Sequence, residues 1–227
     1  MTINTLTIVG VGLIGGSVGL AARKRGLARV VRGLDRDSDR LKQALSLGAV
    51  DEIAVDHASA AASSDLIIVC TPVNRIVDEI ALLAIHAAPA TLLTDVGSTK
   101  SVIVESIEAE LGKLKKAPLF VGSHPLAGSE KQGAEFACAD LFQDRWTIIT
   151  PSKNTPPRAV RRVTDFWQRL GAKVRQMKPG EHDRALAMTS HLPHLLAAAL
   201  AGVLPSKWRE LTASGFRDTT RIAASDP

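Results

Sequence analysis

The stretch Gly10-Val11-Gly12-Leu13-Ile14-Gly15 decides the fold of this 227-residue chain. It directly follows the short apolar run Leu6–Val9, and Asp35 stands twenty positions after its last glycine. This order predicts a strand, a tight turn, a helix and a second strand ending in an acid, as in dinucleotide-binding βαβ units. Ordinary glycine-rich turns can share the glycine spacing, but the preceding strand and the spaced acid favour a dinucleotide site.

Each glycine of this turn has a separate task in gripping a dinucleotide. Gly10 lets the chain turn sharply, Gly12 lets the backbone approach a pyrophosphate, and Gly15 lets the helix pack close to the strand. Leu13 and Ile14 open the helix, whose N-terminus suits an anion because its N–H groups are free. We therefore expect all five residues to contact or shape a cofactor site.

Asp35 stands where the acid of such a site accepts hydrogen bonds from the adenosine ribose. Its carboxylate would repel a ribose 2′-phosphate, which favours NAD over NADP. Arg36 beside it would partly compensate this repulsion, so NADP is the alternative cofactor.

Composition indicates a soluble protein that binds a small anion. Hydrophobic residues make up 45% of the chain, enough for a core, and the net charge of +5 is too mild and scattered to indicate a nucleic-acid surface. Cys70 and Cys138 lie far apart and belong to no CxxC motif, which indicates the reducing cytoplasm. The first residues show neither the basic region nor the long apolar core of a signal peptide, so we expect none, and the longest apolar run, Leu195–Leu204, is too short to span a bilayer. We expect neither a nucleic-acid nor a membrane partner.

Short apolar runs alternate with helical stretches as far as residue 178, after which strand-like runs cease. This predicts an α/β fold, a Rossmann-like and mostly parallel sheet with helices on both faces. We place this dinucleotide-binding domain at residues 1–178, and an incomplete all-helical domain for substrate binding and dimerisation at 179–227. The expected strands are Leu6–Val9, Val30–Leu34, Leu66–Cys70, Leu92–Val96, Leu119–Gly122, Trp146–Thr150 and Lys173–Met177. The expected helices are Leu13–Arg25, Ser38–Leu47 with Ser38 as its cap, Ile76–Ile85, Lys100–Leu111 and Pro157–Leu170.

Parallel sheets bind ligands beyond the carboxyl ends of their strands. Thr71 and Pro72 follow the third expected strand, and Gly97 follows the fourth. We expect these three residues to contact the cofactor.

His124 follows the fifth expected strand and is the one side chain at these ends that titrates near neutral pH. It is therefore the natural proton acceptor. The alternative is a histidine that only satisfies a strand-end carbonyl. Ser98, at the end of the fourth strand, has a similar alternative as the cap of a helix beginning at Thr99.

Further segments make the resemblance to a known family specific. Gly122-Ser123-His124-Pro125-Leu126-Ala127-Gly128, followed by Ser129-Glu130-Lys131-Gln132-Gly133, resembles the signature of the prephenate dehydrogenase family, which includes arogenate and cyclohexadienyl dehydrogenases. Three more segments resemble the same family in its order: Asp95-Val96-Gly97-Ser98-Thr99-Lys100, Ser190-His191-Leu192-Pro193-His194 and Ser214-Gly215-Phe216-Arg217-Asp218-Thr219-Thr220-Arg221. The resemblance spans essentially the whole chain.

The resemblance implies an enzyme of tyrosine biosynthesis that oxidatively decarboxylates a cyclohexadienyl acid with NAD. It places His124 at the ring hydroxyl as the proton acceptor, with Ser98 orienting both groups. Prephenate would give 4-hydroxyphenylpyruvate and L-arogenate would give tyrosine, and no residue here decides between the two acids.

The family also implies residues that bind the substrate. Arg221 would bind a substrate carboxylate, for which a guanidinium offers two-point geometry. His194, Ser129 and Glu130 would line the same pocket. An ion pair between Arg221 and Asp218 is the alternative role for this arginine.

The remaining histidines give weaker signals. His191 and His194 have no third metal ligand in a recognisable pattern, so we expect no metal. His57, His86 and His182 stand in no motif and are expected at the surface.

The resemblance implies a homodimer formed through the C-terminal helical region. Similar proteins continue through further helices of a dimer domain, so this region, which ends here at Pro227, is expected to be truncated. Two other functions compete. A related β-hydroxy acid dehydrogenase would use a lysine of the second domain, and none lies between Lys178 and Lys207. A non-catalytic dinucleotide-binding fragment is the second alternative.

Overall fold

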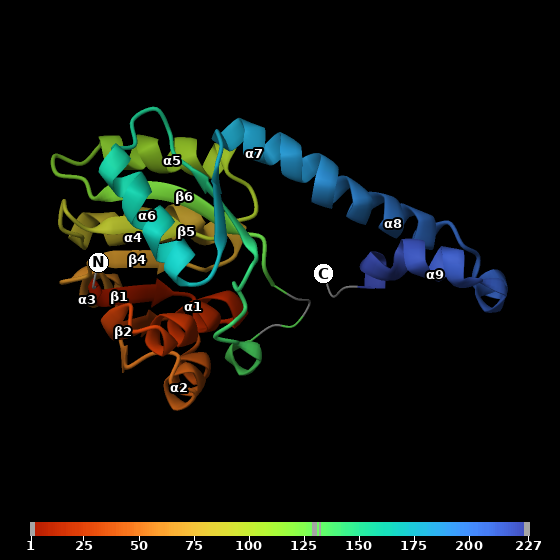
Figure 1. The fold of residues 1–227 in the computed structure, drawn as a ribbon, viewed down its shortest axis with the longest axis horizontal. Coiled ribbons are helices and arrows are strands. Elements are labelled where there is room, and N and C mark those ends of the chain that lie inside the picture. The colour runs from red at the N-terminus through yellow and green to blue at the C-terminus, as the bar shows by residue number, and fades with distance from the viewer. Residues whose placement is uncertain (1–2, 129–130, 132, 225–227) are drawn as a thin grey trace. The chain divides into compact units, whose positions relative to one another are not determined.

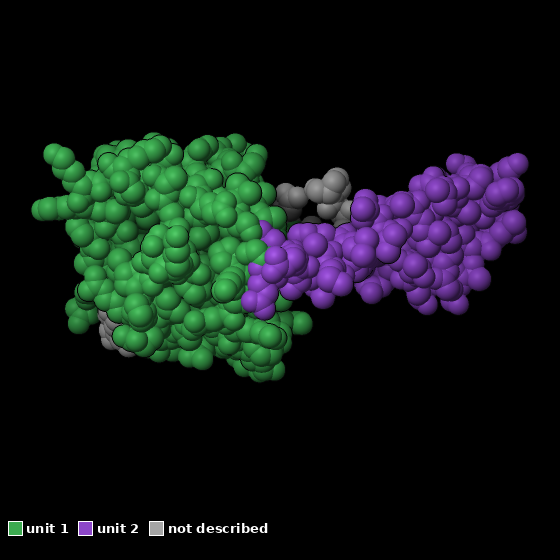
Figure 2. Space-filling model, turned by 90° about the horizontal axis from the view of Figure 1, so that it is seen from above, with its two compact units in different colours: residues 1–180 green, residues 181–227 purple. Residues whose placement is uncertain are grey.

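A computed structural model describes residues 3–128, 131 and 133–224. The chain forms two compact units, residues 1–180 and residues 181–227, coloured separately in Figure 2. The first unit contains the sheet and the second is helical.

The first unit is built on an eight-stranded sheet in the order β3-β2-β1-β4-β5-β6-β7-β8 (Figure 1). All neighbouring strands are parallel except β6 and β7, which are antiparallel. The expected Rossmann-like, mostly parallel sheet is thereby confirmed. The strands are β1 (Ile3–Val9), β2 (Ala28–Leu34), β3 (Glu52–Ile53), β4 (Leu66–Val69), β5 (Leu92–Asp95), β6 (Leu119–Pro125), β7 (Trp146–Thr150) and β8 (Lys173–Gln176).

Helices cover both faces of the sheet, because each strand presents alternate residues to opposite sides. In β4, Leu66 and Ile68 join the apolar cluster that contains α1, α2 and α6, while Ile67 and Val69 join the cluster that contains α3, α4 and α5. Both clusters are closed to solvent. The helices are α1 (Leu13–Lys24), α2 (Ser38–Ser46), α3 (His57–Ala61), α4 (Ile76–His86), α5 (Ser101–Gly112) and α6 (Pro157–Arg169).

Strand β1 is an inner strand of the sheet and lies between β2 and β4. Its last residue, Val9, pairs with Leu34 on one side and with Val69 on the other. The chain leaves β1 in one direction and β4 in the other, so a crevice opens beyond their carboxyl ends.

Trp167 anchors α6 to the middle of the sheet. Its ring is fully buried and makes edge-to-face contacts with Phe142 and Phe166 at centroid distances of 5.3 and 5.7 Å. Its indole N–H donates to Ser123 Oγ at 3.1 Å. This helix therefore packs directly behind the residue that precedes His124.

One local prediction was wrong and two short elements were missed. Asp37, not Ser38, caps α2, because its carboxylate accepts from the N–H groups of Asp39 and Arg40 at 3.0 and 3.1 Å. These hydrogen bonds, that of Arg40 first, lower the pKa of the Asp37 carboxyl. The short β3 and α3 were missed, since two- and five-residue elements carry no readable periodicity.

Strand β6 continues to Pro125, three residues beyond its expected end at Gly122. The extension pairs with antiparallel β7, which continues where the parallel neighbour β5 has ended. His124 therefore lies inside a strand, opposite Ile148, rather than in a loop.

The second unit consists of helices, as expected. Helix α7 (Pro179–Leu186) begins at its boundary and is followed by a π turn (Ala187–His191), α8 (Leu192–Gly202), a 3₁₀ segment (Ser206–Leu211), α9 (Ser214–Thr220) and a second 3₁₀ segment (Arg221–Ala224). Helix α8 packs against α9 and against the segment Arg221–Ala224.

The π turn has an identifiable cause in Pro193. Proline has no N–H, and its ring collides with the carbonyl four residues earlier in a regular helix. Here the turn before it is widened, and the N–H of Leu192 bonds to the carbonyl of Ala187, five residues back.

The continuous helical run Pro179–Gly202 is, by length and composition alone, long and apolar enough to cross a membrane. The expected short apolar run, Leu195–Leu204, overlaps only the end of this longer helix. Length and composition do not distinguish such a helix from one whose apolar face packs against protein.

Candidate functional site

A cavity of about 400 Å³ opens at the carboxyl ends of β1, β2 and β4. It includes six of the ten residues expected to hold a cofactor: Gly10, Gly12, Asp35, Arg36, Thr71 and Pro72. Leu13, Ile14 and Gly15 lie in the first turn of α1, and Gly97 follows β5, and these four do not line the cavity.

The three glycines of the turn differ in the space around them. Gly10 has φ +89°, and a Cβ there would lie 2.9 Å from the carbonyl carbon of Cys70. A Cβ on Gly15 would overlap the carbonyl oxygen of Gly10. A Cβ on Gly12 would meet nothing within 4 Å. Two glycines thus serve close packing, and the third leaves open space in which a ligand can approach the backbone.

The N-terminus of α1 is prepared for an anion. Gly12 is its N-cap residue and provides no side-chain hydrogen bond, and no acidic residue stands in the first turn. The first N–H groups of this helix therefore keep their hydrogen-bonding capacity and the positive end of the helix dipole. A pyrophosphate fits this environment.

Asp35 is held in place by the glycine turn itself. Its Oδ2 accepts from the N–H of Val11 at 3.0 Å and its Oδ1 from the N–H of Asp37 at 3.0 Å. The side chain is only 5% exposed, although it borders the cavity. Each carboxylate oxygen has more than one lone pair, so the group can still accept hydrogen bonds from a ribose diol.

Two arginines stand beside this acid. Arg36 lines the cavity, and Arg40 places its Nη1 3.7 Å from Asp35 Oδ2. Arg40 was missed from the sequence, because its position in the first turn of α2 became clear only with the cap at Asp37. The acid favours a free ribose, while the two cations moderate its charge.

The end of β4 forms the opposite wall. Thr71 Oγ1 is buried and has no hydrogen-bond partner among the described residues, which leaves a polar atom that a bound ligand can satisfy. Cys70 lies beside it, and burial raises the pKa of this thiol far above its ordinary value. The thiol is therefore protonated and unreactive, as expected for a residue that ends a strand.

The position of His57 differs from the expected one. It is half-buried rather than at the surface, and its Nε2 lies 2.7 Å from Glu79 Oε2 in the cavity wall. Arg75 binds the other oxygen of the same carboxylate at 2.9 Å. No motif marks these three residues, because α3 and the start of α4 bring them together from separate parts of the chain. His182, also expected at the surface, is buried.

Ser98 follows the end of β5, and His124 lies within the neighbouring strand β6. Ser98 is exposed and His124 is half-buried. Helix α5 begins at Ser101, and its N-cap residue is Lys100, without a side-chain cap. Ser98 is therefore not the helix cap that was considered as its alternative role.

His194 and Arg221 belong to the second unit. His194 stands in the first turn of α8, which packs against the segment that Arg221 opens. The Nδ1 of His194 donates to the carbonyl of Ser190 at 2.9 Å, which leaves Nε2 with a lone pair in the neutral ring. The described residues show no ion pair between Arg221 and Asp218. Ser129 and Glu130 lie outside the residues that the structure describes.

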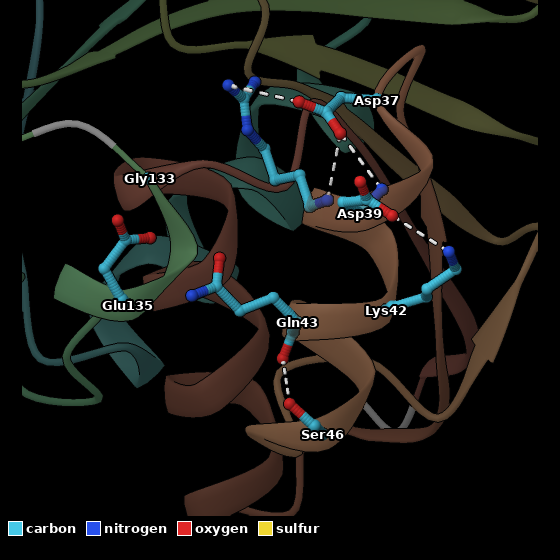
Figure 3. Close-up of a pocket in the computed structure, with 8 residues that line it drawn as sticks. Asp37, Asp39, Lys42, Gln43, Ser46, Gly133 and Glu135 are labelled. Atoms are coloured by element: carbon cyan, nitrogen blue, oxygen red, sulfur yellow. Dashed lines mark hydrogen bonds and ion pairs between the residues drawn. The ribbon is translucent and has the colours of Figure 1, made fainter.

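A larger but shallower hollow of about 730 Å³ lies between α2 and the 3₁₀ turn Ala134–Phe136 (Figure 3). Several of its charged side chains already pair with one another in the first turns of α2. Lys42 bonds to Asp39 at 2.9 Å, and Arg40 lies 3.9 Å from Asp37. The cavity at the glycine turn is therefore the candidate ligand site.

Two models of known protein families match this chain, one after the other along the sequence. Residues 18–176 match the family model of the prephenate dehydrogenase nucleotide-binding domain. Residues 178–227 match that of the prephenate dehydrogenase dimerization domain.

Individual relatives agree with these matches. A cyclohexadienyl dehydrogenase of Zymomonas mobilis is 33% identical over 98% of this chain and 77% of its own length. A prephenate dehydrogenase of Bacillus subtilis is 35% identical over 99% of this chain and 62% of its own. The crystal structure of prephenate dehydrogenase from A. aeolicus, in complex with hydroxyphenyl propionate and NAD+, is similar with a TM-score of 0.89 at 31% identity, covering 100% of this chain and 80% of that one.

Alanine at two positions of the turn should separate binding from packing. Gly12→Ala should leave stability unchanged and weaken NAD binding by about tenfold or more, because its methyl group occupies the space left for the ligand. Gly15→Ala should lower the free energy of unfolding by about 1–3 kcal/mol, because its methyl group overlaps the Gly10 carbonyl. NAD titration and urea unfolding measure the two effects. Unchanged NAD affinity in the Gly12 variant would place the cofactor elsewhere.

Proposed function

The chain belongs to the prephenate dehydrogenase family and is an NAD-dependent oxidoreductase, and from this premise we propose that it converts prephenate to 4-hydroxyphenylpyruvate. The observation that carries the proposal is the joint match of both units, together with a cradle at Gly12 and Asp35 that fits a dinucleotide. L-Arogenate is the second candidate substrate, because the Zymomonas relative is a cyclohexadienyl dehydrogenase. The step would belong to tyrosine biosynthesis.

The cofactor would be held by residues of the first unit. The α1 N-terminus and Gly12 would receive the pyrophosphate, and Asp35 the adenosine ribose, with Thr71 and Pro72 on the opposite wall. NAD supplies the acceptor for the hydride that leaves the hydroxyl-bearing ring carbon. The bond from the ring to its carboxylate then breaks, carbon dioxide leaves, and the ring becomes aromatic.

His124 is proposed as the group that handles the proton. As hydride leaves the ring carbon, the hydroxyl oxygen must lose its proton, which the neutral imidazole accepts and returns to the phenol oxygen of the product. An imidazole suits this exchange near neutral pH. Ser98, at the neighbouring strand end, would orient the hydroxyl and the imidazole.

The substrate's carboxylates call for a cation from the second unit. Arg221 is exposed and, among the described residues, not paired with Asp218. Its planar guanidinium can bind a carboxylate through two parallel hydrogen bonds. His194 would contribute its Nε2 to the same pocket. Ser129 and Glu130 would also line this pocket.

We expect His124→Asn to lower kcat for NAD reduction with prephenate by about 10²–10⁴-fold, because the amide cannot accept the hydroxyl proton. NAD affinity should remain unchanged. His86→Asn, at an exposed position of α4, is the matched control. If the His124 variant turned over normally, another group would be the base.

Arg221→Ala should mainly raise the KM for prephenate, because the loss of the pair would cost about 2–5 kcal/mol of binding free energy if the pair is desolvated. NAD affinity should be preserved, because the proposed cradle lies in the first unit. Arg209→Ala, an exposed arginine of the second unit, is the control. Parallel loss of substrate and NAD binding would instead indicate a structural role for Arg221.

The second unit is proposed to form a homodimer with another copy of this chain. Helix α8 and its π turn expose Met188, Leu195, Leu196 and Val203 by 73, 67, 59 and 74%. A stripe of this kind on a protein surface marks an interface. The match of residues 178–227 to a dimerization domain favours a second copy as its occupant. Both cysteines are unpaired, which agrees with the reducing cytoplasm as the proposed compartment.

Leu195→Asp should therefore shift the chain from dimer to monomer in sedimentation equilibrium, since the charge would be buried in the interface. Val102→Asp, on a 70% exposed valine of α5, should leave the dimer intact. A wild-type chain that is monomeric at all concentrations, or that partitions into lipid vesicles, would contradict the proposal.

A further inference from the structure

A buried ion pair joins the ends of β5 and β6. Asp95 and Lys100 are both fully buried, and the ammonium of Lys100 contacts Asp95 Oδ2 directly. Neither residue lines the cofactor cavity, and the proposed chemistry assigns no role to either.

The pair takes the place of a missing strand neighbour. The parallel ladder between β5 and β6 ends at Thr94 and Val121, so Ser123 lies beyond the last residue that β5 can pair. The N–H of Ser123 donates to Asp95 Oδ1 at 3.1 Å, and its carbonyl accepts from Lys100 Nζ at 2.9 Å. Both backbone groups of Ser123 are thus held by the ion pair.

This arrangement fixes the peptide that leads into His124. A peptide group is planar, so the direction of the Ser123 carbonyl also sets the direction of the N–H of His124. On its other oxygen, Asp95 accepts from the N–H of Gly97 at 2.9 Å, immediately before Ser98. One carboxylate therefore holds the residue preceding each of the two proposed catalytic side chains.

We propose that Asp95 and Lys100 are positioning residues that set the backbone of Ser98 and His124 relative to each other. This inference rests on the proposed function of His124. A buried ion pair adds little net stability compared with apolar residues of the same volume, because desolvation offsets the attraction. Its use here is directional: it supplies two acceptor oxygens and one donor at fixed points where β5 has turned away. The proposal needs no contact of either residue with substrate.

The same cluster contains a hydrogen bond suited as a control. Trp167 donates to the hydroxyl of Ser123 at 3.1 Å, and that hydroxyl bonds to the carbonyl of Asp95. Trp167→Phe removes a buried hydrogen bond from the same residue, yet leaves both backbone groups of Ser123 held by the ion pair. A purely structural role of the cluster would affect both variants alike.

The experiment compares Lys100→Met with Trp167→Phe and with Lys113→Met, an exposed lysine just after α5. Activity with prephenate is expressed per NAD-binding site, so that unfolded protein is not counted. Lys100→Met should lower kcat by about 10–100-fold, the effect of a small misplacement of reacting groups, with the NAD dissociation constant unchanged. The two controls should retain wild-type kcat. In ¹⁵N-histidine-labelled protein, the ring resonances of His124 should shift or broaden in Lys100→Met alone.

Several outcomes would overturn the proposal. One is a wild-type kcat per NAD-binding site in Lys100→Met. Another is a loss of kcat in Trp167→Phe equal to the loss in Lys100→Met. If Lys100→Met does not fold, the neutral double variant Asp95→Asn/Lys100→Met carries the same comparison. Failure of that variant to fold or bind NAD would assign the pair to folding and overturn the proposal as well. Absence of turnover in the wild-type chain would refute the proposed function instead, and the histidine resonances would still test the ion pair.

Discussion

The contact between the Gly10 carbonyl and Gly15 is the constraint on which the first unit depends. It brings α1 against β1 so closely that no side chain fits between them. Since β1 lies between β2 and β4, the same contact directs the helix N-terminus toward the crevice at the ends of these strands. Gly12 is then the point of the turn that faces open space. Close packing and ligand access are therefore two results of one backbone geometry, which is why the glycines cannot be exchanged for one another.

Two carboxylates at strand ends do similar structural work with different consequences. Asp35 links the end of β2 to the glycine turn through Val11, and Asp95 links the end of β5 to β6 through Ser123. The nearest cation to Asp35 is 3.7 Å away, and the carboxylate borders a cavity. Asp95 instead bonds directly to Lys100 and is closed to solvent. The first acid can therefore serve a ligand, while the second can serve only the backbone around it.

The sheet was predictable because most strands contain a short apolar run, such as Leu66–Val69 in β4, and because the glycine turn marks where β1 ends. The site was predictable only where its residues follow strands directly, as Asp35 and Thr71 do. His57 and Glu79 meet through tertiary packing of α3 on α4, and sequence spacing contains no trace of that contact. The extension of β6 to Pro125 depends on pairing with β7, and the sequence around β6 does not indicate this antiparallel neighbour. Lys100 belonged to a recognised segment, but its burial required the structure.

The proposed chemistry is divided between two units, because its interactions differ in how precisely the atoms must be positioned. Proton transfer requires heavy atoms within about 2.6–3.2 Å, so the base must stand on a rigid element. His124 meets this condition inside β6, between a clamped Ser123 and Pro125 with its restricted φ. Attraction between a guanidinium and a carboxylate falls off only inversely with distance, and a long side chain can adjust its reach. Arg221, exposed at the start of a short 3₁₀ segment, has such a long side chain. The helical unit can thus supply the proposed substrate affinity, while the base is held by its strand in the first unit.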